Sequence, residues 1–156
     1  MRVSAGATRR DDHPEPADWR SGVRSQTTVL VVDDDECFRR SIARFLAAAG
    51  FRITTASDGE EALRQCATGL PSAIVLDGEM PHMDGPTFCR CLTRVLGGRI
   101  PPIVVVSGDV FKAADAAWPG VVAAFHKPPP VDRLVRALRD AIDFDRELEQ
   151  DASAVR

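Results

Sequence analysis

The sequence predicts an α/β fold in which helices cover both faces of a doubly wound sheet of five parallel strands. Short apolar runs rich in β-branched residues alternate with longer segments whose apolar residues recur at helical spacing. Continuous apolar runs are typical of strands buried on both faces, and strands that alternate with helices form parallel sheets. A chain of 156 residues suffices for one domain of this kind.

The first half of the chain contains two strand–helix units. We expect a strand over 28–32, followed by a helix that ends at Gly50, because glycine commonly follows the last helical turn. A second strand is expected over 51–56. Asp58 is placed to cap the next helix, with Glu61 three residues later as a capping-box partner.

Three further strands are expected over 73–76, 103–106 and 121–125. A short, weak helix is expected over about 110–117, before Pro119-Gly120 interrupts the pattern. The third helix and the last helix are marked by apolar residues at helical spacing. These residues are Phe88, Leu92, Val95 and Leu96, and then Val131, Leu134, Val135, Leu138 and Ile142.

Charge and composition argue against several classes of protein. The net charge is −3, and 20 basic residues are interspersed with 23 acidic ones, so the sequence predicts neither a nucleic-acid nor a membrane partner. No apolar run approaches the roughly 20 residues needed to span a bilayer. The N-terminus lacks the apolar segment of a signal peptide, so we expect a cytoplasmic protein.

Both ends of the chain are polar. Residues 1–26 are rich in Arg, Asp, Pro, Ser and Gly, and we expect them to form a flexible N-terminal tail. Residues 149–156 are expected to form a C-terminal tail, where the last helix extends or frays.

The cysteines and histidines carry little indication of chemistry. The four cysteines have no partners at zinc spacing, and we expect them to be small core or half-buried residues. His82 and His126 are expected to be solvated. The four cysteines are Cys37, Cys66, Cys89 and Cys91.

Polar residues stand where the predicted strands end. The first strand ends in Asp33-Asp34, the third in Asp77, the fourth in Ser107 and the fifth, after one histidine, in Lys127. In doubly wound sheets, ligands bind at the carboxyl ends of the strands. The sequence therefore predicts one site that combines three carboxylates, a hydroxyl and an ammonium group.

These residue types suit magnesium-dependent phosphoryl transfer. Neighbouring carboxylates repel each other unless a hard cation such as Mg²⁺ neutralises them. A carboxylate at a strand end can act as a nucleophile and form an aspartyl-phosphate. The alternative for Asp33, Asp34 and Asp77 is a helix cap or turn, but Asp35 is better placed to cap the first helix. The residues after Asp77 are expected to form a loop in which Asp84-Gly85 is a turn rather than a helix start.

Four stretches resemble the motifs of the receiver domain of two-component response regulators: "VLVVDDDECFRRSI", "AIVLDGEMPHMDG", "PPIVVVSGD" and "AAFHKPPPVDRL". The resemblance covers roughly residues 27–142, and the motifs occur in the same order. It implies a flavodoxin-like (βα)5 fold with strand order 2-1-3-4-5, and we place the receiver domain at 27–148.

The resemblance implies a role for each acidic residue of the site. Asp77 would accept a phosphoryl group from the histidine of a sensor kinase or of a histidine phosphotransfer protein. Asp34 would bind Mg²⁺ directly, Asp33 would bind it directly or through water, and Asp77 and the backbone carbonyl of Glu79 would complete the protein ligands.

The resemblance also implies that Ser107 senses the phosphoryl group and that Lys127 pairs with it. The Lys127–Pro128 peptide would be cis, as in the family. The family commonly has Tyr or Phe three residues before this lysine, but Ala124 stands there, and Phe125 should point to the opposite face of the strand.

The sequence thus predicts a stand-alone phosphoacceptor receiver that is not a turnover enzyme and that signals by binding an unidentified downstream protein. A homodimer is a weaker expectation for the last helix and the nearby strand. Two alternatives remain open. The first is a receiver-like scaffold that does not use phosphorylation, and the second is a Mg²⁺-dependent phosphatase with an aspartate nucleophile, in which Glu79 would stand at the position of the second acid.

Overall fold

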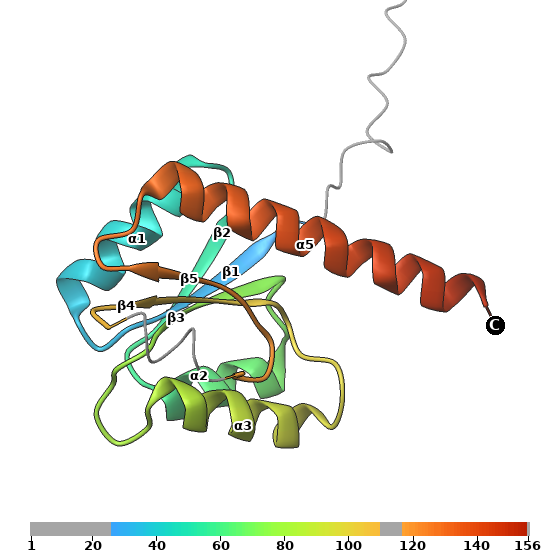
Figure 1. Cartoon of the computed structure of the whole chain (residues 1–156), viewed down its shortest axis with the longest axis horizontal. Coiled ribbons are helices and arrows are strands. Elements are labelled where there is room, and N and C mark those ends of the chain that lie inside the picture. The colour runs from blue at the N-terminus through green and yellow to red at the C-terminus, as the bar shows by residue number, and fades with distance from the viewer. Residues whose placement is uncertain (1–25, 110–116, 156) are drawn as a thin grey trace, which may run out of the picture.

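The computed structural model describes residues 26–109 and 117–155 and shows a three-layer α/β arrangement (Figure 1). Five parallel strands form one sheet in the order β2-β1-β3-β4-β5, which confirms the predicted fold class and strand order. The strands are β1 (Thr28–Val32), β2 (Arg52–Ala56), β3 (Ala73–Asp77), β4 (Ile103–Ser107) and β5 (Val121–His126). The helices are α1 (Glu36–Ala48), α2 (Gly59–Thr68), α3 (Gly85–Leu96) and α5 (Val131–Ala154).

The two faces of the sheet carry separate apolar clusters because side chains alternate along each strand. In β1, Val29 and Val31 pack with α1 and α5, whereas Leu30 and Val32 pack with α2 and α3. Figure 1 shows these two pairs of helices on opposite sides of the sheet. Every residue of β3 and β4 is buried, as expected for central strands covered on both faces.

An aspartate side chain caps the start of each of the helices α1, α2 and α3. Asp35 caps α1, and its carboxylate accepts a hydrogen bond from the Phe38 N–H, as predicted. Asp58 caps α2 as predicted, but the Glu61 carboxylate accepts from the N–H of Ser57 rather than from that of Asp58. The prediction that Asp84-Gly85 forms a turn rather than a helix start is wrong, because Asp84 caps α3.

The start of α3 follows from local chemistry that the turn assignment overlooked. The Asp84 carboxylate accepts a hydrogen bond from the Thr87 N–H at 2.9 Å, and Gly85 and Pro86 form the first turn of the helix. Proline is favoured in a first turn because the backbone N–H groups there have no partner within the helix, so its lack of an N–H costs no hydrogen bond. Asp84 therefore starts the helix that follows the Asp77 loop.

The last helix is longer than the apolar stripe that predicted it. Its buried residues, Leu134, Leu138 and Ile142, each contribute about 1.5–3 kcal/mol by burial against the sheet. The helix continues to Ala154 and so includes most of the residues expected to form a C-terminal tail. In Figure 1 its last turns project beyond the sheet.

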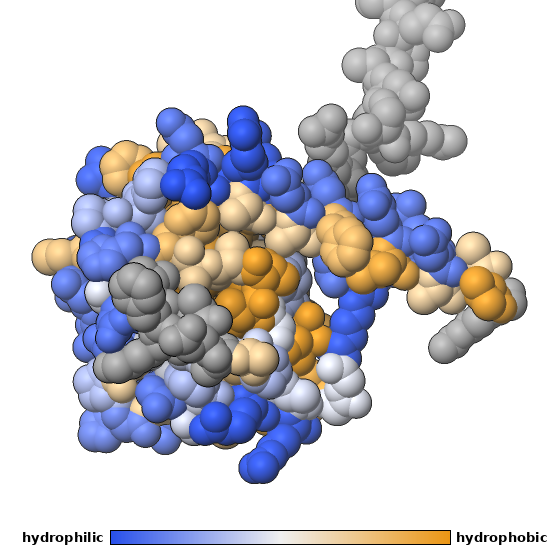
Figure 2. All heavy atoms as spheres, viewed as in Figure 1, coloured by the Kyte–Doolittle hydropathy of each residue, from blue (hydrophilic) through white to orange (hydrophobic). Residues whose placement is uncertain are grey.

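An apolar surface lies along α5 and the edge strand β5. Val122, Phe144 and Leu148 are exposed, and they line a groove of about 430 Å³ together with residues of the loop before β4. Figure 2 shows apolar side chains gathered on this face of the molecule.

The buried cysteines are structural, as predicted. Burial raises the pKa of Cys66 to about 11 and that of Cys89 to about 12, so both remain neutral thiols at neutral pH. Cys91 is half-buried, as expected, but the expectation is wrong for Cys37, which is exposed in the first turn of α1. His82 and His126 are exposed, as expected.

Two regions of the predictions fall outside the described residues. Residues 1–25 contain nearly all of the expected N-terminal tail, and residues 110–116 contain the expected weak helix. Trp118, just after the second region, is buried in the cluster beneath α2 and α3. Within the described part of the chain, no helix is both long enough and apolar enough to cross a membrane.

Candidate functional site

The carboxyl ends of the strands bring the three predicted aspartates together. Carboxylate oxygens of Asp33, Asp34 and Asp77 lie within 4.8 Å of one another. Asp33 and Asp77 are almost completely buried, whereas Asp34 faces solvent. The cluster thus contains two buried acids and one that is exposed to solvent.

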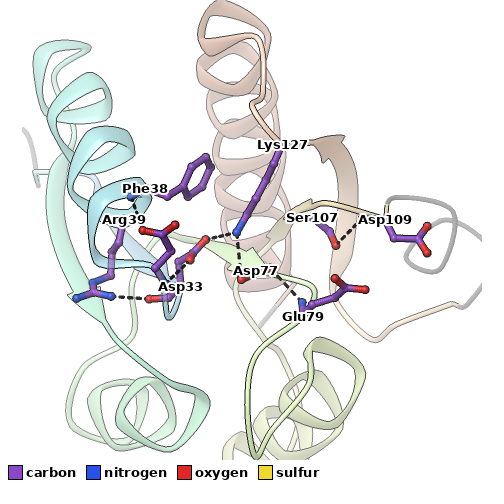
Figure 3. A network of polar contacts seen from close by, with 9 residues as sticks. Asp33, Phe38, Arg39, Asp77, Glu79, Ser107, Asp109 and Lys127 are labelled. Carbon is purple, nitrogen blue, oxygen red and sulfur yellow. Dashed lines mark hydrogen bonds and ion pairs between the residues drawn. The ribbon is translucent and has the colours of Figure 1, made fainter.

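Lys127 reaches this cluster from the end of β5, the strand at one edge of the sheet. Its Nζ lies 2.6 Å from Asp33 Oδ2 and 3.1 Å from Asp77 Oδ2 (Figure 3). The Lys127–Pro128 peptide is cis, as the resemblance implied. Strand β5 ends one residue earlier, and the ammonium group therefore reaches across the edge of the sheet to both buried acids.

Each buried carboxylate is held by the turn that follows its strand. Asp33 Oδ1 accepts from the Asp35 N–H at 2.9 Å, and Asp77 Oδ1 accepts from the Glu79 N–H at 3.0 Å. These bonds use one oxygen of each carboxylate. The second oxygen of each faces Lys127.

The charge state of the site is a balance of opposing effects. Burial raises the pKa of Asp77, and the nearby charge of Asp33 raises it further, while the Glu79 N–H and Lys127 oppose the rise. Burial lowers the pKa of Lys127, but its hydrogen bonds and charge interactions with Asp33 and Asp77 outweigh this and raise it. Lys127 is therefore a full positive charge at neutral pH, and Asp77 is a carboxylate that burial and a like charge destabilise.

Ser107 lies at the end of β4, buried beside the loop that follows Asp77. A Cβ placed on Gly78 would lie only 2.8 Å from Ser107 Oγ, so this hydroxyl packs directly against the Asp77–Glu79 turn. Its oxygen accepts a hydrogen bond from the Asp109 N–H at 3.2 Å. Ser107 is thus next to the loop of Asp77, and its hydroxyl oxygen also accepts a bond from the turn that follows β4.

The donor set fits a hard divalent cation. The grouped oxygens of Asp33, Asp34 and Asp77 are carboxylate ligands of the kind that Mg²⁺ uses, and two of them are buried as acids that need a counter-charge. Lys127 supplies part of that charge. The predicted backbone-carbonyl ligand of Glu79 lies in the turn that holds Asp77.

Two residues at the site were not predicted from the sequence. The Arg39 guanidinium donates to the backbone carbonyl of Asp33 at 2.6 Å, and the ring of Phe38 lies against Lys127. Both stand in the first turns of α1, directly after the acidic residues. The start of α1 beside the strand end was the one indication that these side chains would reach the site.

The predicted absence of an aromatic switch residue is also clear in the structure. Ala124 packs against the cluster beneath α2 and α3, and Phe125 packs on the opposite face of the sheet. Position 124 therefore presents only a methyl group to the α2 and α3 face of the sheet, and the ring of Phe125 lies on the other face.

Comparison with known proteins agrees with this geometry. A family model described as "Response regulator receiver domain" matches residues 29–139. The chain is 36% identical over 127 residues to response regulator MprA of Mycobacterium ulcerans (strain Agy99), covering 81% of this chain and 54% of that protein. It is 35% identical over 128 residues to MprA of Mycobacterium avium (strain 104), covering 81% and 55%. The chain thus spans about half the length of these curated relatives.

Solved structures show the same fold. The chemotaxis protein CheY4 of Vibrio cholerae is 26% identical with a TM-score of 0.68, over 74% of this chain and 98% of that one. A putative response regulator from Chloroflexus aurantiacus J-10-fl is 28% identical with a TM-score of 0.69, over 76% and 98%. NtrX from Brucella abortus is 26% identical with a TM-score of 0.72, over 84% of this chain and 30% of that one.

Proposed function

The chain belongs to the response regulator receiver family, and from this premise we propose that it accepts a phosphoryl group on Asp77 in a histidine-to-aspartate phosphorelay. The observation that carries the proposal is the position of the Lys127 ammonium, 2.6 Å from Asp33 and 3.1 Å from Asp77, beside three grouped carboxylates. A phosphoryl group on Asp77 would add negative charge where a cation is already held.

The proposed reaction makes one bond and breaks one. An oxygen of the Asp77 carboxylate attacks phosphorus and forms an O–P bond, while the N–P bond of a phosphohistidine breaks and its electron pair returns to the imidazole nitrogen. The protein's task is positioning and charge neutralisation. Lys127 would keep its contact with Asp33 and pair with the phosphoryl oxygens, and the Ser107 hydroxyl would donate to one of them.

We propose Mg²⁺ as the cofactor of this site. Asp34 would hold it directly, Asp33 directly or through water, and Asp77 and the Glu79 carbonyl would complete the protein ligands. When bound, the ion neutralises negative charge on the phosphoryl group and its acceptor.

The proposed partners follow from the same reaction. A sensor histidine kinase or a histidine phosphotransfer protein would donate the phosphoryl group, and a downstream protein would recognise the phosphorylated receiver, which we place at residues 27–148. Because the chain spans about half the length of its curated relatives, the expected absence of a nucleic-acid partner stays a prediction. The homodimer and the cytoplasmic location also stay predictions.

Incubation with a small acyl-phosphate donor, followed by intact-mass measurement, tests the proposal. We expect one added phosphoryl group in the presence of Mg²⁺, and none after chelation or in Asp77→Asn. Asp143→Asn is the matched control, because this acid lies on the exposed side of α5, with its side chain 72% exposed. It should be labelled like the wild type.

This experiment and an assay of phosphate-ester hydrolysis test the two alternatives. A receiver-like scaffold would take no label in the wild type with Mg²⁺. A phosphatase would release inorganic phosphate from a small phosphate ester over many turnovers, and either result would contradict the proposal.

A further inference from the structure

The ring of Phe38 covers one side of the Lys127 ammonium group. The distance from Lys127 Nζ to the ring centroid is 4.4 Å, within the range of a cation–π contact. The same nitrogen contacts Asp33 and Asp77, so carboxylates and an aromatic face surround it (Figure 3). Only 23% of the Lys127 side chain remains exposed.

The position of Phe38 is set by bonds on both sides of it. Its N–H donates to the Asp35 carboxylate that caps α1, and the next residue, Arg39, donates to the backbone carbonyl of Asp33. The first turn of α1 is therefore tied to the same loop that carries the acids. The ring cannot move away from Lys127 without the loss of this cap or the rotation of its own side chain.

An aromatic face attracts the Lys127 ammonium without offering it a hydrogen-bond acceptor, which neither water nor a third acid would do. An ammonium group has three N–H donors, and two of its neighbours here are carboxylate oxygens. The ring attracts the cation through its quadrupole but offers no oxygen that would compete for a hydrogen bond. It therefore excludes water from one side of the ammonium and leaves the charge directed at the acids.

We propose that Phe38 is the positioning residue that holds the Lys127 ammonium where a phosphoryl group on Asp77 would meet it, a role that rests on the proposed function. Phe38 acts through Lys127 and does not contact the phosphoryl group. The contact joins the first turn of α1 to the end of β5, so the lysine is held from the two sides of the site.

A packing role is the competing explanation. Phe38 is half-buried and packs against the apolar cluster of α1 and α5, where a leucine would fill most of the same space. Phe38→Leu therefore keeps an apolar side chain and removes the aromatic face, whereas Phe38→Tyr keeps the face. Phe45→Leu is the matched control, because it makes the same change on the same helix at a side chain that is 54% exposed.

The first experiment measures the accessibility of Lys127 and needs no phosphorylation. Lys112 and Lys127 are the two lysines of the sequence, so amine acetylation at limiting reagent, followed by peptide mass spectrometry, reports Lys127 against an internal reference. We expect Phe38→Leu to raise the labelling of Lys127 relative to Lys112 at least twofold. Phe38→Tyr and Phe45→Leu should match the wild type. Equal labelling of Phe38→Leu and wild type would overturn the proposal.

The second experiment is a double-mutant cycle on the rate of phosphorylation by the small donor. We expect Phe38→Leu to slow the reaction about two- to fivefold, the effect of a contact of this class at a partly exposed site. In a Lys127→Met background, the same change should have no further effect, because there is no ammonium to position. Effects that multiply independently would show that Phe38 acts by packing alone.

The two experiments separate the failure of this inference from the failure of the proposed function. If the wild type takes no phosphoryl group, the proposed function is wrong, and the acetylation result still decides whether Phe38 covers Lys127. If the wild type is phosphorylated and Phe38→Leu matches it in both measurements, only the role of Phe38 is wrong.

Discussion

Lys127 Nζ lies 2.6 Å from Asp33 Oδ2, although 94 residues separate them in the chain and two strands, β3 and β4, lie between β1 and β5 in the sheet. This ion pair spans the carboxyl ends of the strands, and the same ammonium group also contacts Asp77, which lies between them at the end of β3. The pair is mostly buried, with 3% of the Asp33 side chain exposed. Loss of either partner would leave the other charge without its counter-charge at a mostly buried place, so the pair matters to the stability of the fold as well as to the charge of the site.

Removal of the ammonium should cost stability. We expect Lys127→Met to lower the free energy of unfolding at pH 7 by about 2–3 kcal/mol, because Asp33 and Asp77 then remain buried without a counter-charge. Urea denaturation with a chelator present measures the change. Arg40→Met breaks an ion pair with Glu36 whose side chains are 78% and 64% exposed, and it should cost about 0.5 kcal/mol or less. A Lys127→Met protein as stable as the wild type would show that the acids need no partner.

Magnesium should stabilise the folded protein through the acidic cluster. At about ten times its dissociation constant, an ion that binds only the folded state adds roughly 1.4 kcal/mol to the free energy of unfolding. Denaturation with and without Mg²⁺ measures this gain. We expect Asp34→Asn to require much more Mg²⁺ for the same gain, whereas Asp151→Asn, at an exposed position on α5, should respond like the wild type. An equal response of Asp34→Asn and wild type would place the ion elsewhere.

Gly78 should tolerate no side chain. A Cβ at this position would lie 2.8 Å from Ser107 Oγ and 2.9 Å from Ser107 Cβ. We expect Gly78→Ala to destabilise the protein by about 1–3 kcal/mol, because overpacking forces the Asp77 turn away from β4. Gly98→Ala meets nothing within 4 Å and should leave the free energy of unfolding unchanged or slightly higher. Thermal unfolding measures both variants, and equal midpoints for Gly78→Ala and Gly98→Ala would contradict the close packing of Gly78 against Ser107.

The cap of α3 should make a pH-dependent contribution to stability. Hydrogen bonds from Thr87 lower the pKa of Asp84 below its ordinary value of 3.8, so its stabilising charge is present above that pH and is lost as the pH falls through the lower folded value. We expect Asp84→Ala to cost about 1 kcal/mol at pH 7 and less at pH 3 and below. Asp84→Asn keeps a capping side chain and should cost less at pH 7. Urea denaturation over this pH range checks both, and a cost of Asp84→Ala that grows as the pH falls would contradict the assignment.

Local patterns predicted most of the elements because their causes are local. The β-branched runs became the five strands to within a residue or so of their expected ends, and Asp35 and Asp58 cap the helices that they were expected to cap. Asp84 was misassigned because the same dipeptide, Asp-Gly, suits both a turn and a capped helix start. The choice depended on Pro86 and on the packing of α3 against the sheet.

The sequence predicted which polar residues meet at this edge, because parallel strands deliver their carboxyl ends to one edge of the sheet whatever surrounds them. Asp33, Asp34, Asp77, Ser107 and Lys127 all lie at that edge in the structure. Only the tertiary structure decided how Lys127 divides its contacts between two acids and that Phe38 covers one side of its ammonium group. Those contacts depend on the side-chain conformations and reach of residues from α1 and from the end of β5, and no periodicity along the chain encodes the distance between them.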